Sequence, residues 1–315
     1  MSVLDKIKSA KRPLFTFELL PPLKGHSIDR IYRTIDSLIE YEPAYINFTS
    51  HRNEVVLKER PDGLIEKRTV RKRPGTVALA AAVRYKYDVT VVPHVLCGGF
   101  TKEETENVLI DMHFLGIHDV LALRGDPPRG SRTFVPEENG HRYSYELVSQ
   151  IADMNNGSYL DDVDNTPTSF CIGVAGYPEK HIEAANMKAD LERLKQKVDA
   201  GGNYIVTQMF FDNKKYYDFL KMVRELGIDV PVIPGIKPVA ALNDVNLLPQ
   251  TFNIDMPEDL VKELAKCKTN EEAREVGIEW TTMQSKDLLA NNVPGIHYYT
   301  LGASDNISRI VKASY

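Results

Sequence analysis

Polar side chains repeatedly follow short apolar runs in this 315-residue sequence. In residues 120–128 the run Val-Leu-Ala-Leu is followed by Arg, Gly and Asp, and then by two prolines that cannot continue a strand. The same arrangement recurs along the chain, and the polar residues that it delivers are Glu18, Thr49, His94, Arg124, Asp126, Tyr177 and Gln208. Carboxylates, an imidazole, a guanidinium and an amide together suit acid–base chemistry on a polar heterocycle.

Several of these residues also have a purely structural interpretation. Glu18 is either a salt-bridge partner or a general acid, and its apolar sequence neighbours predict a raised pKa. Asp126 is either a turn cap before proline or a functional carboxylate. His94 is either a hydrogen-bonded structural histidine or a ligand contact, and Tyr143 and Tyr177 are either packing aromatics or ligand contacts. The sequence alone leaves these alternatives open.

Two groups of charged residues lie away from the strand ends. Asp190 and Lys197 are seven residues apart, which places them two turns along one face of a predicted helix. They are either surface charges or partners for a ribose hydroxyl and a phosphate. A basic run is either a solvated surface or a feature that attracts an anionic ligand; it comprises Lys67, Arg68, Arg71, Lys72 and Arg73.

The elements that must position these residues alternate between strand and helix. Apolar runs predict strands at residues 15–18, 46–49, 91–94, 120–123, 172–177, 204–208, 232–235 and 296–299. Helical periodicity falls near residues 28–39, 76–86, 101–116, 144–155, 186–200, 214–226, 257–266, 271–291 and 304–313. Eight strands that are each followed by a helix predict a single-domain (β/α)8 TIM barrel over residues 1–315, with an extra helix before the last strand. Residues 51–75 are predicted to be a long, irregular polar connection.

The alternative fold is an open, doubly wound sheet. That fold would need a Gly-x-Gly-x-x-Gly turn after an early strand to bind a dinucleotide, and neither this turn nor a P-loop occurs. The strand count and the missing fingerprint both favour the barrel. A barrel brings the carboxyl ends of all its strands to one face, so polar residues that are distant in sequence converge there.

Composition narrows the class of protein. The sequence is 43% apolar and 26% charged, and its net charge of -5 with a pI near 6.0 argues against a nucleic acid as the main partner. No apolar run is long enough to cross a membrane, and the first residues lack the apolar centre of a signal peptide. Cys97, Cys171 and Cys267 are widely spaced, which favours a reducing cytoplasm over a disulfide framework, and we expect no metal site.

Six motifs in order along the chain carry a resemblance to a known family. They are Phe17-Glu18-Leu19-Leu20-Pro21-Pro22, Pro93-His94-Val95-Leu96-Cys97, Leu123-Arg124-Gly125-Asp126-Pro127-Pro128, Tyr177-Pro178-Glu179-Lys180-His181, Thr207-Gln208-Met209-Phe210-Phe211-Asp212 and Ile233-Pro234-Gly235-Ile236-Lys237-Pro238. Together with Asp190, Leu191 and residues 195–201, they resemble methylenetetrahydrofolate reductase in its short, single-domain bacterial form. The resemblance runs from about residue 15 to residue 301.

The resemblance implies an FAD-dependent reduction of 5,10-methylenetetrahydrofolate to 5-methyltetrahydrofolate. NADH or NADPH is the implied hydride donor, in a ping-pong order, and a cytoplasmic homo-oligomer is expected. Glu18 matches the family's general acid, Asp126 the carboxylate near flavin and pterin, and Gln208 a pterin-binding amide. The positions that match contacts to FAD or nicotinamide are Thr49, His94, Arg124, Gly125, Tyr143, Tyr177, His181, Asp190 and Lys197.

The chain departs from the family pattern in three places. The connection over residues 51–75 is longer than in the compact bacterial form, Gly302-Ala303 stand where the family commonly has Asn-Arg, and Leu248 replaces an aromatic residue. Two other functions are therefore kept as alternatives. One is another flavin-dependent barrel oxidoreductase of the proline dehydrogenase kind, and the other is a non-catalytic homologue that binds folate or flavin.

Overall fold

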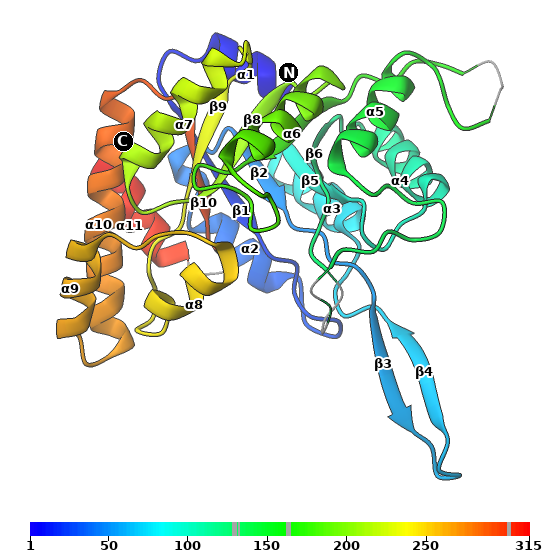
Figure 1. Cartoon of the computed structure of the whole chain (residues 1–315), viewed down its shortest axis with the longest axis horizontal. Coiled ribbons are helices and arrows are strands. Elements are labelled where there is room, and N and C mark those ends of the chain that lie inside the picture. The colour runs from blue at the N-terminus through cyan, green and yellow to red at the C-terminus, as the bar shows by residue number, and fades with distance from the viewer. Residues whose placement is uncertain (128–130, 132, 162–164, 301–303) are drawn as a thin grey trace.

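Eight parallel strands close into a barrel in the described part of the chain, in the order β1-β10-β9-β8-β7-β6-β5-β2 (Figure 1). The computed structural model describes residues 1–315 except 128–130, 132, 162–164 and 301–303. The strands are β1 (Leu14–Leu19), β2 (Tyr45–Phe48), β5 (Val91–Leu96), β6 (Asp119–Leu123), β7 (Cys171–Gly176), β8 (Tyr204–Met209), β9 (Val232–Ile236) and β10 (Gly295–Tyr299). The predicted barrel and all of its predicted strands are confirmed.

Alternation along the strands separates an inner from an outer apolar layer. Tyr45, Val92, Leu121 and Tyr204 belong to a cluster inside the barrel, whereas their strand neighbours pack outward against the helices. The inner layer depends on a glycine, because a Cβ atom on Gly173 would lie only 2.5 Å from the ring of Tyr204. The barrel interior is therefore filled by side chains rather than left as a pore.

The helices that cover the barrel follow the predicted ranges closely. They are α2 (Asp29–Asp36), α3 (Thr76–Tyr87), α4 (Lys102–Phe114), α5 (Ser144–Asn155), α6 (Met187–Asp199), α7 (Asn213–Glu225), α9 (Glu258–Lys266), α10 (Asn270–Ala290) and α11 (Ser304–Ser314). The start of α4 is fixed by a capping box in which Thr101 and Glu104 each accept a hydrogen bond from the backbone of the other.

Two helices were not predicted. α1 (Val3–Ser9) precedes the barrel, and α8 (Asp244–Phe252) makes three helices rather than two between β9 and β10. The sequence signal of α8 is weak because Pro249 lies inside it and the side chain of its N-cap residue, Asn243, makes no capping hydrogen bond. In addition, the first predicted helix ends at Asp36 and a separate 3-10 turn follows.

The prediction of an irregular connection over residues 51–75 was wrong. β3 (Glu54–Glu59) and β4 (Ile65–Val70) form an antiparallel hairpin that projects from the barrel in Figure 1. Its turn contains Asp62-Gly63, with Gly63 at a φ of 78°, which is a typical hairpin signal. Polar and apolar residues are mixed on both faces of the hairpin, so no buried face marked these strands in the sequence.

One end of the barrel is closed by α1. Val3 packs in the inner cluster, and its backbone N–H donates to the carboxylate of Asp119 at 2.7 Å. The opposite end, where the strands have their carboxyl termini, carries the polar residues described below, and we call it the mouth of the barrel. No helix in the described chain is long and apolar enough to cross a membrane.

Candidate functional site

A buried carboxylate and two histidines meet at the mouth of the barrel. Oε2 of Glu18, on β1, lies 3.4 Å from Nε2 of His94 on β5 and 3.9 Å from Nε2 of His297 on β10. Thr300 fixes the backbone beside this carboxylate, because its hydroxyl donates to the carbonyl oxygen of Glu18 at 2.6 Å. Glu18 is only 8% exposed, so any reaction that it serves takes place inside the mouth rather than at the surface.

The predicted rise in the pKa of Glu18 was wrong for the free protein. Burial does raise the pKa of this carboxyl, but the influence of His297, whose ring lies close to it, and the charges of His94 and His51 outweigh burial, so the pKa lies below its ordinary value. The prediction failed because it counted only the apolar neighbours in sequence. The strand directs Glu18 inward, toward the imidazoles, and away from those neighbours.

Two histidines near this carboxylate, His94 and His51, have lowered pKa values. Burial lowers the pKa of His94 to about 4, so its ring is neutral at pH 7, and its Nε2 also lies 3.4 Å from Nδ2 of Asn47. His51 accepts or donates a hydrogen bond with Thr49 at 3.2 Å, and burial together with Arg73 lowers its pKa. His94 therefore adds a polar but uncharged group to the mouth at neutral pH.

A second part of the site is a pocket of about 260 Å³ beside the mouth, which we call the side pocket. It is lined by residues from β6, α5, β7 and α6, including two stacked tyrosines, Tyr143 and Tyr145, whose rings are 5.7 Å apart. It gathers most of the residues predicted to contact a cofactor, which are Arg124, Tyr143, Tyr177, His181, Asp190 and Lys197. Residues from four separate elements are thus brought to one pocket.

The charges of the side pocket are held in place by backbone groups. Asp190 accepts a hydrogen bond from the backbone N–H of His181 at 2.9 Å, and the ammonium of Lys197 donates to the carbonyl oxygen of Ala175. Burial lowers the pKa of Lys197 to about 8, although Asp190 opposes this shift. Both side chains are 8% exposed, so their interpretation as surface charges is wrong. A cation, a carboxylate and stacked aromatic rings match the needs of a nucleotide.

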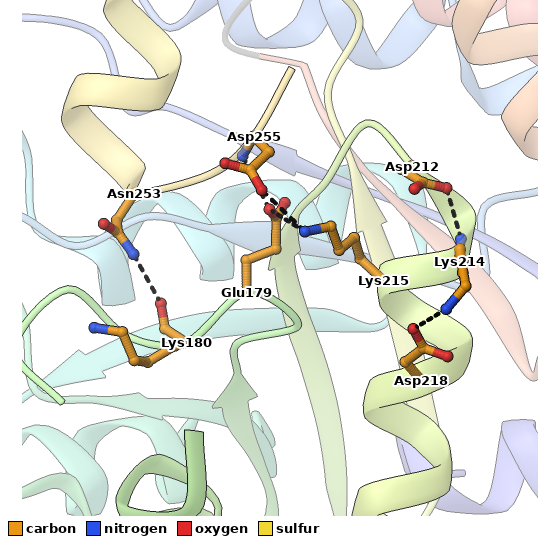
Figure 2. A network of polar contacts seen from close by, with 8 residues as sticks. All are labelled: Glu179, Lys180, Asp212, Lys214, Lys215, Asp218, Asn253 and Asp255. Atoms are coloured by element: carbon orange, nitrogen blue, oxygen red, sulfur yellow. Dashed lines mark hydrogen bonds and ion pairs between the residues drawn. The ribbon is translucent and has the colours of Figure 1, made fainter. Parts of the chain in front are cut away.

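The loop that carries Tyr177 and His181 is anchored from its far side. Figure 2 shows Glu179 accepting from the backbone N–H of Asp255 at 2.9 Å, while Lys215, at the start of α7, lies 2.9 Å from Asp255 and 3.6 Å from Glu179. Burial raises the pKa of Glu179 to about 7. This network joins two connections and the first turn of α7, all distant in sequence, and it anchors one wall of the side pocket.

The segment after β6 runs between the mouth and the side pocket. Arg124 pairs with Glu183 at 2.6 Å, and its guanidinium lies 4.9 Å from the ring centre of Phe134. Gly125 has a φ of 83°, a conformation that favours glycine and turns the chain sharply. Asp126 is exposed, and its charge raises the pKa values of both His51 and Tyr177, which places it electrostatically between the two parts of the site.

Gln208 and Leu248 lie in different surroundings. Gln208 is half-buried on β8, and its Oε1 accepts from the backbone N–H of Met209 at 2.9 Å. Leu248 is buried in an apolar cluster with Met209 and Phe211, so it packs in the interior. The departure at Gly302-Ala303 lies outside the described residues.

Several residues of the site were not predicted from the sequence. His297, Thr16 and Asn47 surround Glu18 and His94, while Tyr145 and Arg193 line the side pocket. His297 carried a usable signal, since it lies two residues before Tyr299 in a strand and therefore faces the same side. The helix residue Arg193 carried no such signal, because charged residues surround it in the sequence.

A larger cavity of about 1050 Å³ opens beside the mouth, between α3 and α4. Its lining includes His51 and His94 near the mouth, and Val108 and Met112 further out. Within the described residues, no group of three or more His, Cys, Asp or Glu side chains is arranged to hold a metal ion. Independently of this, the carboxylate, imidazole and amide groups at the mouth suit proton transfer and polar recognition.

Comparisons with known proteins agree with the motifs found in the sequence. The family model described as "Methylenetetrahydrofolate reductase" matches residues 3–315. The chain is 31% identical over 314 residues to "Methylenetetrahydrofolate reductase (NADH) 1" of Arabidopsis thaliana, covering 96% of this chain and 48% of that protein. It thus spans about half the length of this plant relative.

A bacterial relative is covered over most of its length. The chain is 29% identical over 291 residues to "5,10-methylenetetrahydrofolate reductase" of Escherichia coli (strain K12), covering 92% of this chain and 86% of that protein. Among solved structures, an uncharacterized protein from Clostridium thermocellum that binds two copies of 5-methyl-5,6,7,8-tetrahydrofolic acid has a TM-score of 0.59 at 14% identity, covering 98% of this chain and 97% of that one. This last likeness supports the fold alone.

Proposed function

The chain belongs to the methylenetetrahydrofolate reductase family, and from this premise we propose that it reduces 5,10-methylenetetrahydrofolate to 5-methyltetrahydrofolate, with FAD as cofactor and NADH or NADPH as hydride donor. The observation that carries the proposal is the pairing of two neighbouring features. A buried carboxylate, Glu18, lies inside the mouth, and a pocket of about 260 Å³ that holds a buried lysine and a buried aspartate lies beside it. Neither feature alone would distinguish this reaction from other chemistry in a barrel.

The residues of the side pocket fit FAD. Lys197 supplies a cation for a phosphate, Asp190 a carboxylate for a ribose hydroxyl, and the stacked rings of Tyr143 and Tyr145 an aromatic surface. Thr49, His94, Arg124, Gly125, Tyr177 and His181 are proposed as further contacts, as the sequence motifs imply. When bound, FAD supplies the hydride chemistry, so that the nicotinamide and the folate can react in turn in a ping-pong order.

Glu18 is proposed to supply the proton that the folate needs. Opening the five-membered ring of methylenetetrahydrofolate requires a proton on N10, and Glu18 is the carboxyl group buried inside the mouth. Its pKa is low in the free protein because imidazoles surround it. A ligand that covers the mouth excludes water and disfavours the charged carboxylate, so we infer that Glu18 takes up a proton when the folate binds.

Asp126 and Gln208 are proposed to recognise the heterocycle. Asp126 acts from the exposed segment after β6, where its charge reaches both His51 and Tyr177. The amide oxygen of Gln208 accepts a local hydrogen bond from the backbone N–H of Met209. A bound ligand can take the place of this hydrogen bond. A carboxylate and an amide together match the donors and acceptors along the edge of a pterin.

An absorption spectrum tests the proposal directly. The purified protein should show a flavin spectrum that is bleached by NADH or NADPH under anaerobic conditions and restored by methylenetetrahydrofolate. A flavin that is bleached but not restored by the folate would indicate another flavin-dependent barrel oxidoreductase, such as one of the proline dehydrogenase kind. A protein that binds folate or flavin without any bleaching would be a non-catalytic homologue.

A further inference from the structure

His297 is a buried histidine whose environment points to Glu18. Its side chain is 0% exposed, and Nε2 has no hydrogen-bond partner among the described residues. That nitrogen nevertheless lies 3.9 Å from Oε2 of Glu18. Buried polar groups in proteins are nearly always hydrogen-bonded, so an unpaired ring nitrogen this close to a carboxylate points to that carboxylate as its partner.

Thr16 is the hydrogen-bond partner of the other ring nitrogen of His297, Nδ1. Its hydroxyl lies 3.3 Å from Nδ1 of His297, and both residues are fully buried. Thr16 is also the register partner of His297 across β1 and β10, and it lies two residues before Glu18 on the same face of its strand. A hydroxyl that donates to Nδ1 leaves the proton of a neutral imidazole on Nε2, facing Glu18.

The other histidine beside Glu18 is placed differently. Nε2 of His94 lies 3.4 Å from Glu18 and also 3.4 Å from Nδ2 of Asn47, so two groups share this nitrogen. The remaining titratable groups whose charges act on Glu18, or on which its charge acts, are His51 from the segment after β2 and Tyr299 from β10. Only His297 combines a fixed Nδ1 partner with an Nε2 that faces the carboxylate.

We propose that His297 is the positioning residue of Glu18, donating its Nε2–H to Oε2 of the carboxylate that forms when Glu18 gives its proton to the substrate. This inference rests on the proposed function. The O–H bond of protonated Glu18 breaks as the N–H bond of the substrate amine forms, and the carboxylate then accepts the hydrogen bond from His297. Glu18 takes up its next proton from water when the next folate binds and covers the mouth. His297 keeps its own proton throughout.

If His297 had only a structural role, its ring would serve to fill space against Tyr299, whose ring centre lies 5.1 Å from that of the histidine.

Two substitutions of His297 separate this structural role from the proposed positioning role. His297→Gln keeps an N–H near the position of Nε2, whereas His297→Leu keeps bulk without a donor. With methylenetetrahydrofolate as oxidant, H297L should slow flavin reoxidation by about 10- to 100-fold, as expected when a catalytic group is misplaced, and H297Q should restore most of that rate. The bleaching of the flavin by NAD(P)H should not change.

Two further measurements do not depend on the overall rate. In flavin-free protein carrying ¹³C-carboxyl-labelled glutamate, the pKa of Glu18 should rise in H297L, because a donor to the carboxylate is lost, and should stay near the wild-type value in H297Q. Thr16→Val, which removes the hydroxyl beside Nδ1 and leaves the histidine itself unchanged, should raise the pKa of Glu18 by a smaller amount. If H297L does not fold, H297Q and T16V still test the contact.

The decisive experiment combines two substitutions. Since His297 acts through Glu18, H297L should cause no further loss of reoxidation rate in a protein that already carries Glu18→Gln. The proposal would be overturned if the two substitutions reduced the reoxidation rate independently, so that the loss in the double variant equalled the product of the single losses. An unchanged pKa of Glu18 in H297L would also overturn it. If wild-type protein is not reoxidised by the folate at all, the proposed function fails, whereas the carboxyl titration still decides whether His297 governs Glu18.

Discussion

Oε2 of Glu18 and Nε2 of His94 lie 3.4 Å apart at the mouth of the barrel, although β1 and β5 are separated by β2 in the sheet. Because the pKa of His94 is lowered to about 4, this contact is not an ion pair at neutral pH. His94 is therefore a neutral, polar neighbour of the carboxylate. Such a neighbour does not hold Glu18 in its charged form as a cation would, so the carboxylate can be protonated when a ligand removes water from the mouth.

Glu18→Gln should separate the two halves of the reaction. The amide keeps the shape of the side chain but cannot donate the proton that the folate needs. Bleaching of the flavin by NAD(P)H should stay near the wild-type rate, while reoxidation by methylenetetrahydrofolate should fall by about 10²- to 10⁴-fold. Rapid-mixing absorbance measures both rates. An equal loss in both halves would show that Glu18 only maintains the structure of the site.

The fold followed from the sequence because every barrel strand combines an apolar run with a polar end. That pattern predicted the eight strands and most of the covering helices. The hairpin of β3 and β4 was not predicted, because neither of its faces is buried. Its strands therefore lack the alternation of polar and apolar residues that packing against a core would impose. α8 was not predicted because it contains Pro249, which disfavours a helix locally. The packing of Leu248 in the interior, which the sequence does not reveal, explains why the helix forms.

The site was predictable only where a residue type is unusual for its place. A glutamate in an apolar strand and a lysine and an aspartate two turns apart on a helix could be singled out, and the structure buries Glu18, Asp190 and Lys197. The sign of the pKa shift of Glu18 could not be predicted. It depends on His94 and His297, whose strands lie far away in the sequence and approach β1 only when the barrel closes.

Lys197→Ala should weaken the retention of FAD. The substitution removes a buried cation from the side pocket, and a charge-assisted hydrogen bond to a phosphate is worth about 1.5–3 kcal/mol. Dissociation constants from flavin fluorescence should therefore rise by roughly 10- to 150-fold. Lys188→Ala, an exposed lysine on the same helix, is the matched control and should leave affinity unchanged. Equal FAD affinities in the two variants would show that Lys197 does not bind a phosphate of FAD.

Asp126→Asn should alter the flavin and the folate together. A negative charge near the isoalloxazine ring disfavours an anionic reduced flavin, so its removal should raise the midpoint potential and slow the folate reaction. Spectroelectrochemical titration measures the potential. Glu138→Gln, an exposed acid in the same connection between β6 and α5, controls for the change in net charge. If the flavin midpoint potential changes equally in both variants, Asp126 has no specific effect on the flavin and serves only as a turn residue.

Asp119→Asn should stabilise the protein at neutral pH and remove one source of its pH dependence. Burial raises the pKa of Asp119 to about 6, against an ordinary value of 3.8. A raised folded-state pKa means that the folded protein binds the proton more tightly, so this group's contribution to stability is present below pH 4 and is lost as the pH rises through 6. The loss amounts to about 3 kcal/mol at pH 7. Asparagine cannot ionise, and its oxygen can still accept the hydrogen bond from Val3 that docks α1.

Urea unfolding between pH 4 and pH 8 tests this expectation. The difference in unfolding free energy between D119N and wild type should grow from pH 4 to pH 6 and level off above it, because only the wild-type residue ionises in that window. Asp229→Asn, at an exposed position in the connection between α7 and β9, should show no such growth. A difference between D119N and wild type that stays constant over the whole range would mean that Asp119 ionises without cost to the folded state.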